Sequence, residues 1–306
     1  MTFVYICIPV HDEERTIGPV LWKIRETMAE YGRDYEVLVV DDASTDRTSE
    51  VLARYARVLP LTVHRCESRS GYAAALETAV REAVRRSEYP KRDAVVTLQG
   101  DFTEDPGFIP ELVKRIEGGA DVVTSASAQD TRGAPGGLRL ARRAFEWLAR
   151  RRDWPEALAN PASGFRAYRV ISLRKAIDEA GETPLMDRDG WLADLALLRA
   201  VVPHARRLEE ADAPTRHGRL QRPSRFDLKA SVRQVMGVVG SGTARSAASE
   251  TWKSVVHAPA ERARGNGSNG RRRGNGARTS TGTGRSRRPE GERRPRARPR
   301  AEDAEG

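Results

Sequence analysis

The first 130 residues alternate between short apolar runs and longer amphipathic segments, and this alternation limits the possible folds more than any other feature. Apolar runs without regular polar interruptions are typical of strands that helices bury on both faces. Strand and helix segments that repeat in this order predict an α/β fold, with a doubly wound, mainly parallel sheet and helices on both faces. The expected strands are Phe3–Val10, Tyr35–Val40, Leu61–Cys66, Ala94–Leu98 and Asp121–Thr124, and the expected helices are Thr16–Tyr31, Asp46–Val58, Tyr72–Ser87 and Phe108–Glu117.

The pattern loosens after Gly136 but continues. There we expect a basic helix, an extended segment, two further helices, a strand and a last amphipathic segment. In that order they are Leu138–Arg151, Ser163–Val170, Ile171–Ala180, Trp191–Val201, Arg206–Ala211 and Phe226–Val239.

The last part of the chain has a different composition. Residues 257–306 contain no Val, Ile, Leu, Met, Phe, Trp or Tyr, and they carry 14 Arg against 6 acidic residues. Without apolar side chains to bury, nothing offsets the conformational entropy lost on ordering. We therefore expect a globular domain in residues 1–240, a helical or irregular extension in 241–256 and a disordered Arg/Gly-rich basic tail in 257–306.

Several classes of protein are excluded by composition. The longest apolar stretches fall far short of the ~20 residues of a membrane-spanning helix, and the amino terminus does not resemble a signal peptide. Two cysteines, Cys7 and Cys66, make neither a disulfide framework nor a four-ligand zinc site. Of the net charge of +10, the tail carries most, since residues 1–256 hold 39 basic and 37 acidic side chains. An intracellular enzyme or binding protein remains.

Carboxylates follow three of the expected strands. Open α/β sheets bind ligands beyond the carboxyl ends of their strands, so the loops there are the place to search. One acid in such a loop is commonly a helix cap or a turn residue, but three acidic loops at one edge favour a site. The loops are Pro9-Val10-His11-Asp12-Glu13-Glu14, Asp41-Asp42-Ala43-Ser44-Thr45-Asp46 and Gln99-Gly100-Asp101-Phe102-Thr103-Glu104-Asp105.

The chemistry of this edge suits a nucleotide bound with a metal. The glycine-rich loop of dinucleotide-binding folds is absent after the first strand. Carboxylates repel a diphosphate unless a divalent cation such as Mg²⁺ lies between them and takes oxygens from both. Carboxylates also accept hydrogen bonds from a ribose or a base. A metal–nucleotide site is therefore favoured over a nicotinamide site.

These three loops, together with Asn160-Pro161-Ala162-Ser163-Gly164-Phe165-Arg166, resemble the motifs of family 2 glycosyltransferases with the GT-A fold. The order and spacing are most similar to the dolichol- or polyprenyl-phosphate mannose synthase branch, over residues 3–240. The resemblance implies a metal-dependent, inverting hexosyltransferase that uses a GDP- or UDP-sugar, with Mg²⁺ or Mn²⁺ as cofactor and a polyprenyl phosphate as acceptor.

The resemblance also implies roles for individual residues. Asp101 is the expected metal ligand and a catalytic residue. The other expected catalytic residues are Arg222 and Arg225, in a late basic loop with Ser224 that closes over the diphosphate, and Glu104 and Asp105. Arg139 and Arg143 are the expected acceptor-phosphate contacts. The expected nucleotide-sugar contacts are Pro9, His11, Glu13, Asp41, Asp42, Gln99 and Gly100.

The chain departs from the family pattern at four places. Gln99 stands where an Asp is usual, Thr103 where the lipid-phosphate enzymes often have Gln, and Ser127 where Arg is frequent. Arg69-Ser70-Gly71 replaces the common Asn-x-Gly. Gln99 removes one negative charge from the metal site, so metal affinity is expected to fall or to depend on the diphosphate.

Three classes of function remain open at this point. A polyprenyl phosphate acceptor is already an anion and needs no general base, whereas a hydroxyl of a glycan or small molecule needs one. Glu104, Asp105 and Asp187 are the candidates for that base. The third class is a non-catalytic binder of nucleotide sugars or nucleic acid.

A lipid acceptor would be met at the membrane surface, and the basic tail offers a contact with anionic lipid, worth ~1 kcal/mol per basic residue near the surface. A solubilising or nucleic-acid-binding tail and an inert extension are the alternatives. We expect a cytoplasmic enzyme with peripheral contact at the inner face of the membrane and no specific nucleic-acid partner.

Overall fold

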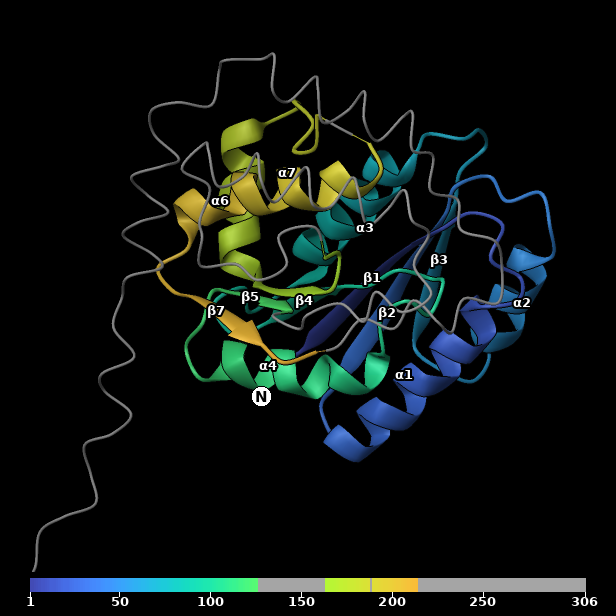
Figure 1. The fold of residues 1–306 in the computed structure, drawn as a ribbon, viewed down its shortest axis with the longest axis horizontal. Coiled ribbons are helices and arrows are strands. Elements are labelled where there is room, and N and C mark those ends of the chain that lie inside the picture. Colours follow the sequence, from blue (N-terminus) through green and yellow to red (C-terminus); the bar gives the residue numbers. More distant parts are fainter. Residues whose placement is uncertain (126–162, 188, 214–306) are drawn as a thin grey trace, which may run out of the picture. The chain divides into compact units, whose positions relative to one another are not determined.

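The computed structural model describes residues 1–125, 163–187 and 189–213, which all lie in the first of two compact units, Met1–Pro259. These residues form a sheet with the strand order β3-β2-β1-β4-β6-β5-β7 (Figure 1). The strands are β1 (Val4–Val10), β2 (Tyr35–Asp41), β3 (Leu61–Arg65), β4 (Ala94–Thr97), β5 (Val122–Ser125), β6 (Arg166–Arg169) and β7 (Leu208–Ala211).

The sheet is mainly parallel, as expected. β1 pairs in parallel with β2 on one side and β4 on the other, with Val4 opposite both Tyr35 and Ala94. β2–β3 and β5–β7 are also parallel. β6 is the exception, because it lies antiparallel between β4 and β5. The parallel block β3-β2-β1-β4 therefore ends at β4.

Helices cover both faces of the sheet (Figure 1). Side chains of three of them join one hydrophobic core and those of the other three join a second core, across the sheet. The first set is α1 (Ile17–Tyr31), α2 (Thr48–Tyr55) and α4 (Ile109–Glu117), and the second is α3 (Tyr72–Arg86), α6 (Val170–Ala180) and α7 (Trp191–Val201). Two short 3₁₀ turns are η1 (Pro106–Phe108) and η2 (Val202–His204).

The central strand shows why the apolar runs do not alternate with polar residues. All of β1 is buried. Ile6 and Ile8 enter the first core while Tyr5 and Cys7 enter the second, because successive side chains of a strand point to opposite faces. β3 differs: it is an edge strand with mostly exposed residues, and Val63 is 36% exposed. The expectation that the Leu61–Cys66 run is buried on both faces is wrong, because no strand lies beyond it in the described sheet and few side chains cover it.

The described elements otherwise match the expected ones, with ends that shift by a few residues. α1, for example, begins at Ile17 and ends at Tyr31. The next residue, Gly32, has a left-handed backbone (φ +66°) and donates its N–H to the Met28 carbonyl. The expected helix Leu138–Arg151, the segment Phe226–Val239, the extension and the tail lie outside the described residues. No helix in the described part of the chain has the length and apolar character to cross a bilayer.

Candidate functional site

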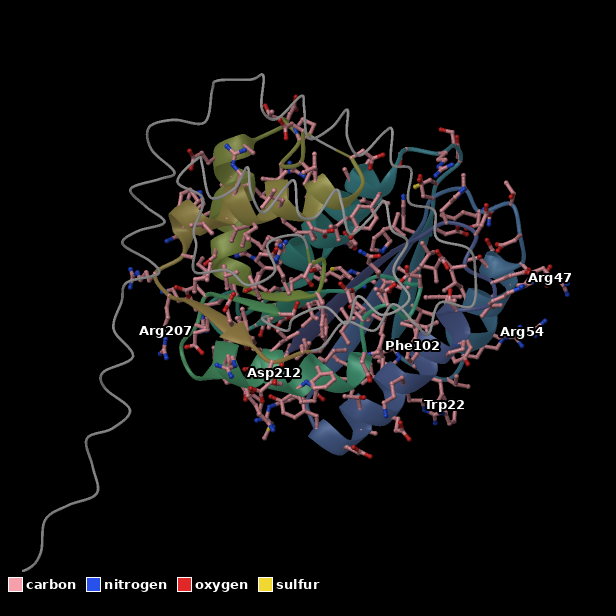
Figure 2. The ribbon with its side chains drawn as sticks, in the orientation of Figure 1. Trp22, Arg47, Arg54, Phe102, Arg207 and Asp212 are labelled. Atoms are coloured by element: carbon pink, nitrogen blue, oxygen red, sulfur yellow. The ribbon has the colours of Figure 1, made fainter. Side chains whose placement is uncertain are left out.

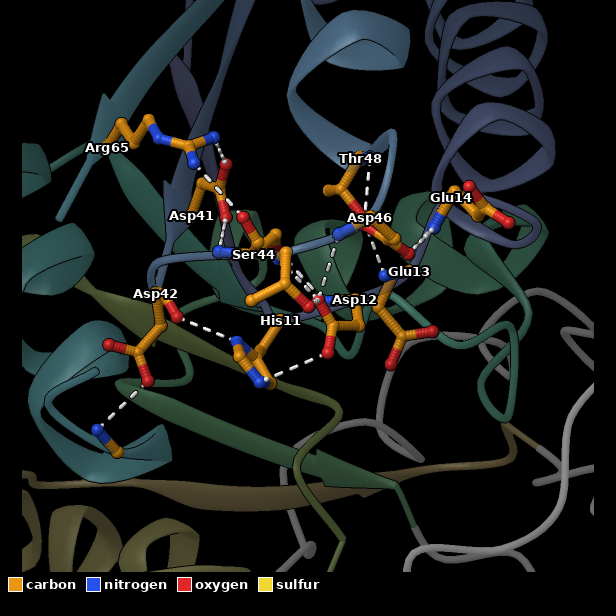
Figure 3. A network of polar contacts seen from close by, with 12 residues as sticks. His11, Asp12, Glu13, Glu14, Asp41, Asp42, Ser44, Asp46, Thr48 and Arg65 are labelled. Atoms are coloured by element: carbon orange, nitrogen blue, oxygen red, sulfur yellow. Dashed lines mark hydrogen bonds and ion pairs between the residues drawn. The ribbon is translucent and has the colours of Figure 1, made fainter. Parts of the chain in front are cut away.

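The three acidic loops lie at one edge of the sheet, as the sequence predicts. β2, β1 and β4 are adjacent and parallel, so their carboxyl ends point the same way. The loops that follow them hold the expected residues His11, Asp42 and Asp101. Figure 3 shows the first two loops joined by a network of hydrogen bonds, and we call this edge the carboxylate rim.

Each loop of the carboxylate rim contains one non-glycine residue with a left-handed backbone. The residues are Asp12 (φ +52°), Ala43 (φ +52°) and Phe102 (φ +63°), the last labelled in Figure 2. This conformation costs roughly 1–2 kcal/mol for an L-residue, and such outliers collect at functional sites. In the described part of the chain no other non-glycine residue has a positive φ. The strain therefore coincides with the rim.

His11 joins the first loop to the second. Its Nδ1 lies 2.7 Å from the main-chain oxygen of Asp42, so Nδ1 donates to that carbonyl. Its Nε2 lies 3.3 Å from Asp12 Oδ2. Both ring nitrogens thus face oxygen acceptors, and the protonated imidazolium can donate to both. His11 fixes the backbone of Asp42 rather than extending away from the rim.

The Asp42 carboxylate is held by the segment that leads into α3. It accepts hydrogen bonds from the Ser70 amide (2.6 Å), the Ser70 hydroxyl (2.8 Å) and the Gly71 amide (2.9 Å). Burial alone would raise the pKa of Asp42, but these hydrogen bonds and the nearby His11 outweigh it and lower the pKa. Asp42 is therefore a fixed anion at neutral pH.

Asp41 is oriented differently from its neighbour. Its carboxylate is fully buried and accepts bonds from the Ser44 amide (2.9 Å), the Ser49 hydroxyl (2.5 Å) and Arg65 (3.0 Å). All three partners belong to β3 or to the loop and helix after β2. These contacts stabilise the loop that presents Asp42 (Figure 3).

The first loop makes further hydrogen bonds to the second loop and to the start of α2. Asp12 Oδ1 accepts from the Thr45 amide at 2.7 Å, and the pKa of Asp12 is lowered because this bond and His11 outweigh its partial burial. Glu13 is buried, its amide donates to Thr48 Oγ1 (2.8 Å), and its carboxylate accepts from the Thr16 hydroxyl (2.7 Å). Glu13 thereby fixes the start of α1.

The third loop approaches the first through a glycine. A Cβ on Gly100 would lie 2.7 Å from Val10 Cγ1, so only a residue without a side chain fits. Asp101 is half-buried, and its Oδ1 accepts from the Thr103 amide at 2.9 Å. The main-chain N–H of Gln99 donates to Glu104 Oε2 at 3.0 Å. Glu104 therefore closes the loop on itself.

Glu104 and Asp105 have different surroundings. Glu104 is buried, and burial, with the nearby negative charges of Asp194 and Asp101, raises its pKa to about 8 against the pull of the Gln99 amide and Arg166. It is therefore mostly protonated at neutral pH. Asp105 caps η1, where its Oδ1 accepts from the Gly107 amide at 2.9 Å.

A buried cluster beneath the third loop was not predicted as part of the site. Asp194 of α7 accepts from the Tyr72 hydroxyl at 3.0 Å, and its main-chain oxygen accepts from Arg166. Burial raises the pKa of Asp194 to about 6, although Arg166 and Tyr72 lower it. The signal in the sequence was one acid within the apolar run Trp191–Val201. Arg166 is fully buried at the start of β6.

The rim supplies only part of a metal coordination sphere. No group of three or more His, Cys, Asp or Glu residues capable of holding a metal occurs among residues 1–125, 163–187 and 189–213. Mg²⁺ commonly takes one or two protein carboxylates and completes its sphere with substrate phosphates and water. The Asp101 carboxylate, the Gln99 amide oxygen and the Thr103 hydroxyl are oxygen ligands of the right kind. The residues fit a cation shared with a diphosphate.

The expected basic residues lie elsewhere in the chain. Arg139, Arg143, Arg222, Ser224 and Arg225 all lie outside the described residues. Asp187 is described and exposed, two residues before Asp189, which contacts the start of α3. The roles expected for these arginines stay predictions.

Comparisons with known proteins bear on this site. The family model "Glycosyl transferase family 2" matches residues 5–176, more than half of the chain. An "Undecaprenyl-phosphate 4-deoxy-4-formamido-L-arabinose transferase" of Pseudomonas aeruginosa is 31% identical over 52% of this chain and 41% of its own. A "Dodecaprenyl-phosphate galacturonate synthase" of Rhizobium johnstonii is 28% identical over 37% of this chain and 32% of its own. The chain matches less than half the length of these relatives.

A solved structure is similar in fold. The glucosyl-3-phosphoglycerate synthase of Mycobacterium tuberculosis, in complex with Mn²⁺, uridine diphosphate and glucosyl-3-phosphoglycerate, superposes with a TM-score of 0.55 at 20% identity. The superposition covers 78% of each chain. At this identity the likeness shows the shared α/β fold.

Proposed function

Because the chain belongs to glycosyltransferase family 2, we propose that it transfers a hexose from a GDP- or UDP-sugar to a polyprenyl phosphate, with inversion at the anomeric carbon. The observation that carries this proposal is the carboxylate rim, where Asp42 and Asp101 stand at the ends of adjacent parallel strands. The names of the two curated relatives support a polyprenyl phosphate acceptor.

On the donor side, Asp42 is the residue that recognises the nucleoside. A carboxylate that is already oriented by three hydrogen bonds loses little freedom when it accepts a further bond from a ribose hydroxyl or a base N–H. Its lowered pKa keeps it an acceptor at neutral pH. His11 holds the backbone of Asp42 in place from the neighbouring loop.

Asp101, with Gln99 and Thr103, is the side of the rim that would hold Mg²⁺ or Mn²⁺. Bound there, the cation would neutralise charge that develops on the departing diphosphate. The Mn²⁺ and uridine diphosphate named for the similar solved structure support this assignment. Arg222 and Arg225 are proposed to stabilise, with their positive charges, the negative charge that develops on the diphosphate. Electrostatic stabilisation of this kind is usually the largest catalytic effect.

Glu104 is one of three candidate bases for a hydroxyl acceptor, with Asp105 and Asp187. Its buried carboxyl has a pKa of about 8 and is mostly protonated at pH 7, so only a minor ionised fraction could act as that base. A phosphate oxygen needs no such base. It forms the new bond to the anomeric carbon as the bond to the diphosphate oxygen breaks, and the nucleoside diphosphate leaves. Arg139 and Arg143 are proposed to orient this phosphate by charge-assisted hydrogen bonds.

The test is release of nucleotide from a panel of GDP- and UDP-sugars with Mn²⁺, with and without a short polyprenyl phosphate. We expect release to require the lipid phosphate and the product to be an acid-labile glycosyl phosphodiester. Asp101→Asn should lower turnover by roughly two to three orders of magnitude, a typical loss for one transition-state contact. The exposed Glu182→Gln is the control and should match the unmodified enzyme. Transfer to hydroxyl acceptors alone, or an active Asp101→Asn, would overturn the proposal.

We also propose that the enzyme meets its lipid acceptor as a peripheral protein at the inner face of the membrane, with the Arg-rich residues 257–306 in contact with anionic lipid. Attraction of this kind weakens with salt, because it is screened beyond a Debye length. Deletion of residues 257–306 should reduce co-sedimentation with anionic vesicles at low salt, and leave the thermal unfolding midpoint unchanged. Equal partitioning of the two proteins would contradict the membrane contact.

A further inference from the structure

The segment that leads into α3 and includes its first two residues is held from two sides by carboxylates that come from distant parts of the chain. We call this segment, Ser70–Ala73, the α3 turn. On one side, the amides of Ser70 and Gly71 donate to Asp42, as described above. On the other side, the amide of Ala73 donates to Asp189 Oδ1 at 2.9 Å. Asp189 lies in the loop before α7, 116 positions further along the sequence than Ala73.

Asp189 supplies a cap that α3 cannot supply for itself. The N-cap residue of α3 is Gly71, which has no side chain to accept a bond from the first turn. The first amides of a helix have no partner within it, and a carboxylate there is stabilised by the helix dipole. Asp189 therefore takes, from outside the helix, the place that Ser or Asp commonly fills at an N-cap.

Gly71 makes this contact possible. Its backbone has φ +96°, which L-residues rarely adopt, and a Cβ at this position would lie 2.8 Å from Asp189 Oδ2. The carboxylate of Asp189 thus lies directly against the backbone of Gly71. The same glycine donates its amide to Asp42. One residue contacts both carboxylates.

α7 holds the α3 turn at a further point. The Tyr72 hydroxyl lies 3.0 and 3.2 Å from the two carboxylate oxygens of Asp194, which is buried in α7. The loop before α7 and α7 itself therefore both fix the α3 turn. This anchoring leaves Asp189 as the exposed, replaceable contact, since Asp194 is also part of the buried cluster with Arg166.

We propose that Asp189 is a positioning residue for the donor site: by capping α3 it fixes the two amides that hold Asp42. The inference rests on the proposed role of Asp42 in binding the nucleoside diphosphate. Asp189 itself need not touch the donor. Its effect passes through Gly71, whose amide donates to Asp42 and whose missing Cβ leaves room for the Asp189 carboxylate.

The test compares Asp189→Ala, Asp189→Asn and the control Glu182→Ala, which removes an exposed acid a few residues earlier in the chain. Titration calorimetry with UDP and with GDP, each with Mn²⁺, gives the dissociation constant. ¹³C NMR of the Asp42 carboxyl gives its pKa in the absence of nucleotide. We expect Asp189→Ala to weaken binding on the order of 5- to 10-fold, within the range of couplings in a shared hydrogen-bond network, and to raise the pKa of Asp42.

Asn retains an oxygen that can accept from the Ala73 amide, so Asp189→Asn should recover most of both effects. Glu182→Ala should change neither. A purely structural role would lower the thermal unfolding midpoint of Asp189→Ala without moving the pKa of Asp42 in the folded protein, and would overturn the inference. Equal effects of Asn and Ala would also count against it.

A second comparison uses the glycine. Gly71→Ala places a methyl group against Asp189, whereas Gly181→Ala carries a similar backbone penalty at φ +58° with open space around the new Cβ. Gly71→Ala should weaken nucleotide binding and Gly181→Ala should not. Asp42→Asn separates the two levels of the argument. If it leaves nucleotide binding unchanged, the proposed function of Asp42 fails; if it weakens binding while Asp189→Ala and Gly71→Ala do not, only the positioning role fails.

Discussion

At the carboxylate rim, single side chains decide how closely the loops approach and which charge each one carries. Gly100 lets the third loop lie against Val10. The adjacent aspartates Asp41 and Asp42 have different roles, because Asp41 is buried against Arg65 and Asp42 faces the α3 turn. Glu104 shows that burial can keep neutral a carboxyl that is ordinarily charged at pH 7. Acidic residues of the same type thus differ in charge state and in partners, because their local surroundings differ.

Gly100→Ala should destabilise the protein, because the new methyl group overlaps Val10 Cγ1 in a closely packed place. Overpacking of this kind costs about 1–3 kcal/mol. In the double variant Val10→Ala/Gly100→Ala the total loss should be smaller than the sum of the two single losses, since Val10→Ala makes room for the methyl group. Urea unfolding measures both, with Gly118→Ala, where the nearest atoms lie at 3.4 Å, as the control. A Gly100→Ala protein as stable as the control would contradict the close approach.

Glu104 should make the protein less stable as pH rises. Its folded pKa of about 8 is above the ordinary value of 4.5, so its contribution is fully present below pH ~4.5 and is lost as pH rises through 8. Asp194, with a pKa of about 6, acts in the same direction but at lower pH. Glu104→Gln stays neutral and should remove roughly 2 kcal/mol of pH dependence between about pH 6 and 8.

The measurement is the free energy of unfolding in urea at several pH values, compared between the two proteins. The difference should grow steadily toward pH 8. Parallel curves above pH 6 would mean that Glu104 is ionised in the folded protein at neutral pH and available there as a base.

At the scale of elements, one arginine joins the strand that breaks the parallel order to its surroundings. Arg169, at the end of β6, donates to Asp121 (2.9 Å) and to main-chain oxygens of Lys91, Ile116 and Ala120. These partners precede β4, end α4 and precede β5. A planar guanidinium with five donors can serve such a fan of acceptors, whereas an ammonium group cannot. Arg169 therefore fixes where β6 meets β4 and β5.

Arg169→Lys should lower the free energy of unfolding by about 2–3 kcal/mol, since several largely enclosed oxygens lose a charged donor together. Arg85→Lys is the matched control, because Arg85 is 71% exposed and pairs with Glu82 on the surface of α3. Exposed pairs contribute ~0–1 kcal/mol. Chemical denaturation of both variants measures the difference, and equal losses would show that the Arg169 contacts add little.

At the scale of the whole molecule, the periodicity of the sequence predicts most of the fold. Alternation of apolar runs and helical segments is a local signal, so it predicts the positions of β1 to β5 and of the helices between them. The family expected from four ordered motifs is confirmed by the match over residues 5–176. The sequence also predicts the common edge of the three acidic loops, because parallel strands require it.

What the sequence could not predict depends on distant partners. The exposure of β3 follows from its edge position, the antiparallel β6 from pairing between segments far apart, and the pKa of Glu104 from burial beside Asp194. The cap that Asp189 provides spans 116 residues. None of these has a periodic signature. The roles assigned to Arg139, Arg143, Arg222 and Arg225 stay predictions.

Because β6 lies between β4 and β5 in the sheet, the strands cannot pair in the order in which they are synthesised. In the described sheet β5 pairs only with β6 and β7, both of which follow it in the chain. A ribosome adds roughly 5–20 residues per second, so β5 emerges several seconds before its first partner. During that interval β1–β4 can already associate, while β5 remains an unpaired apolar segment that a chaperone could bind.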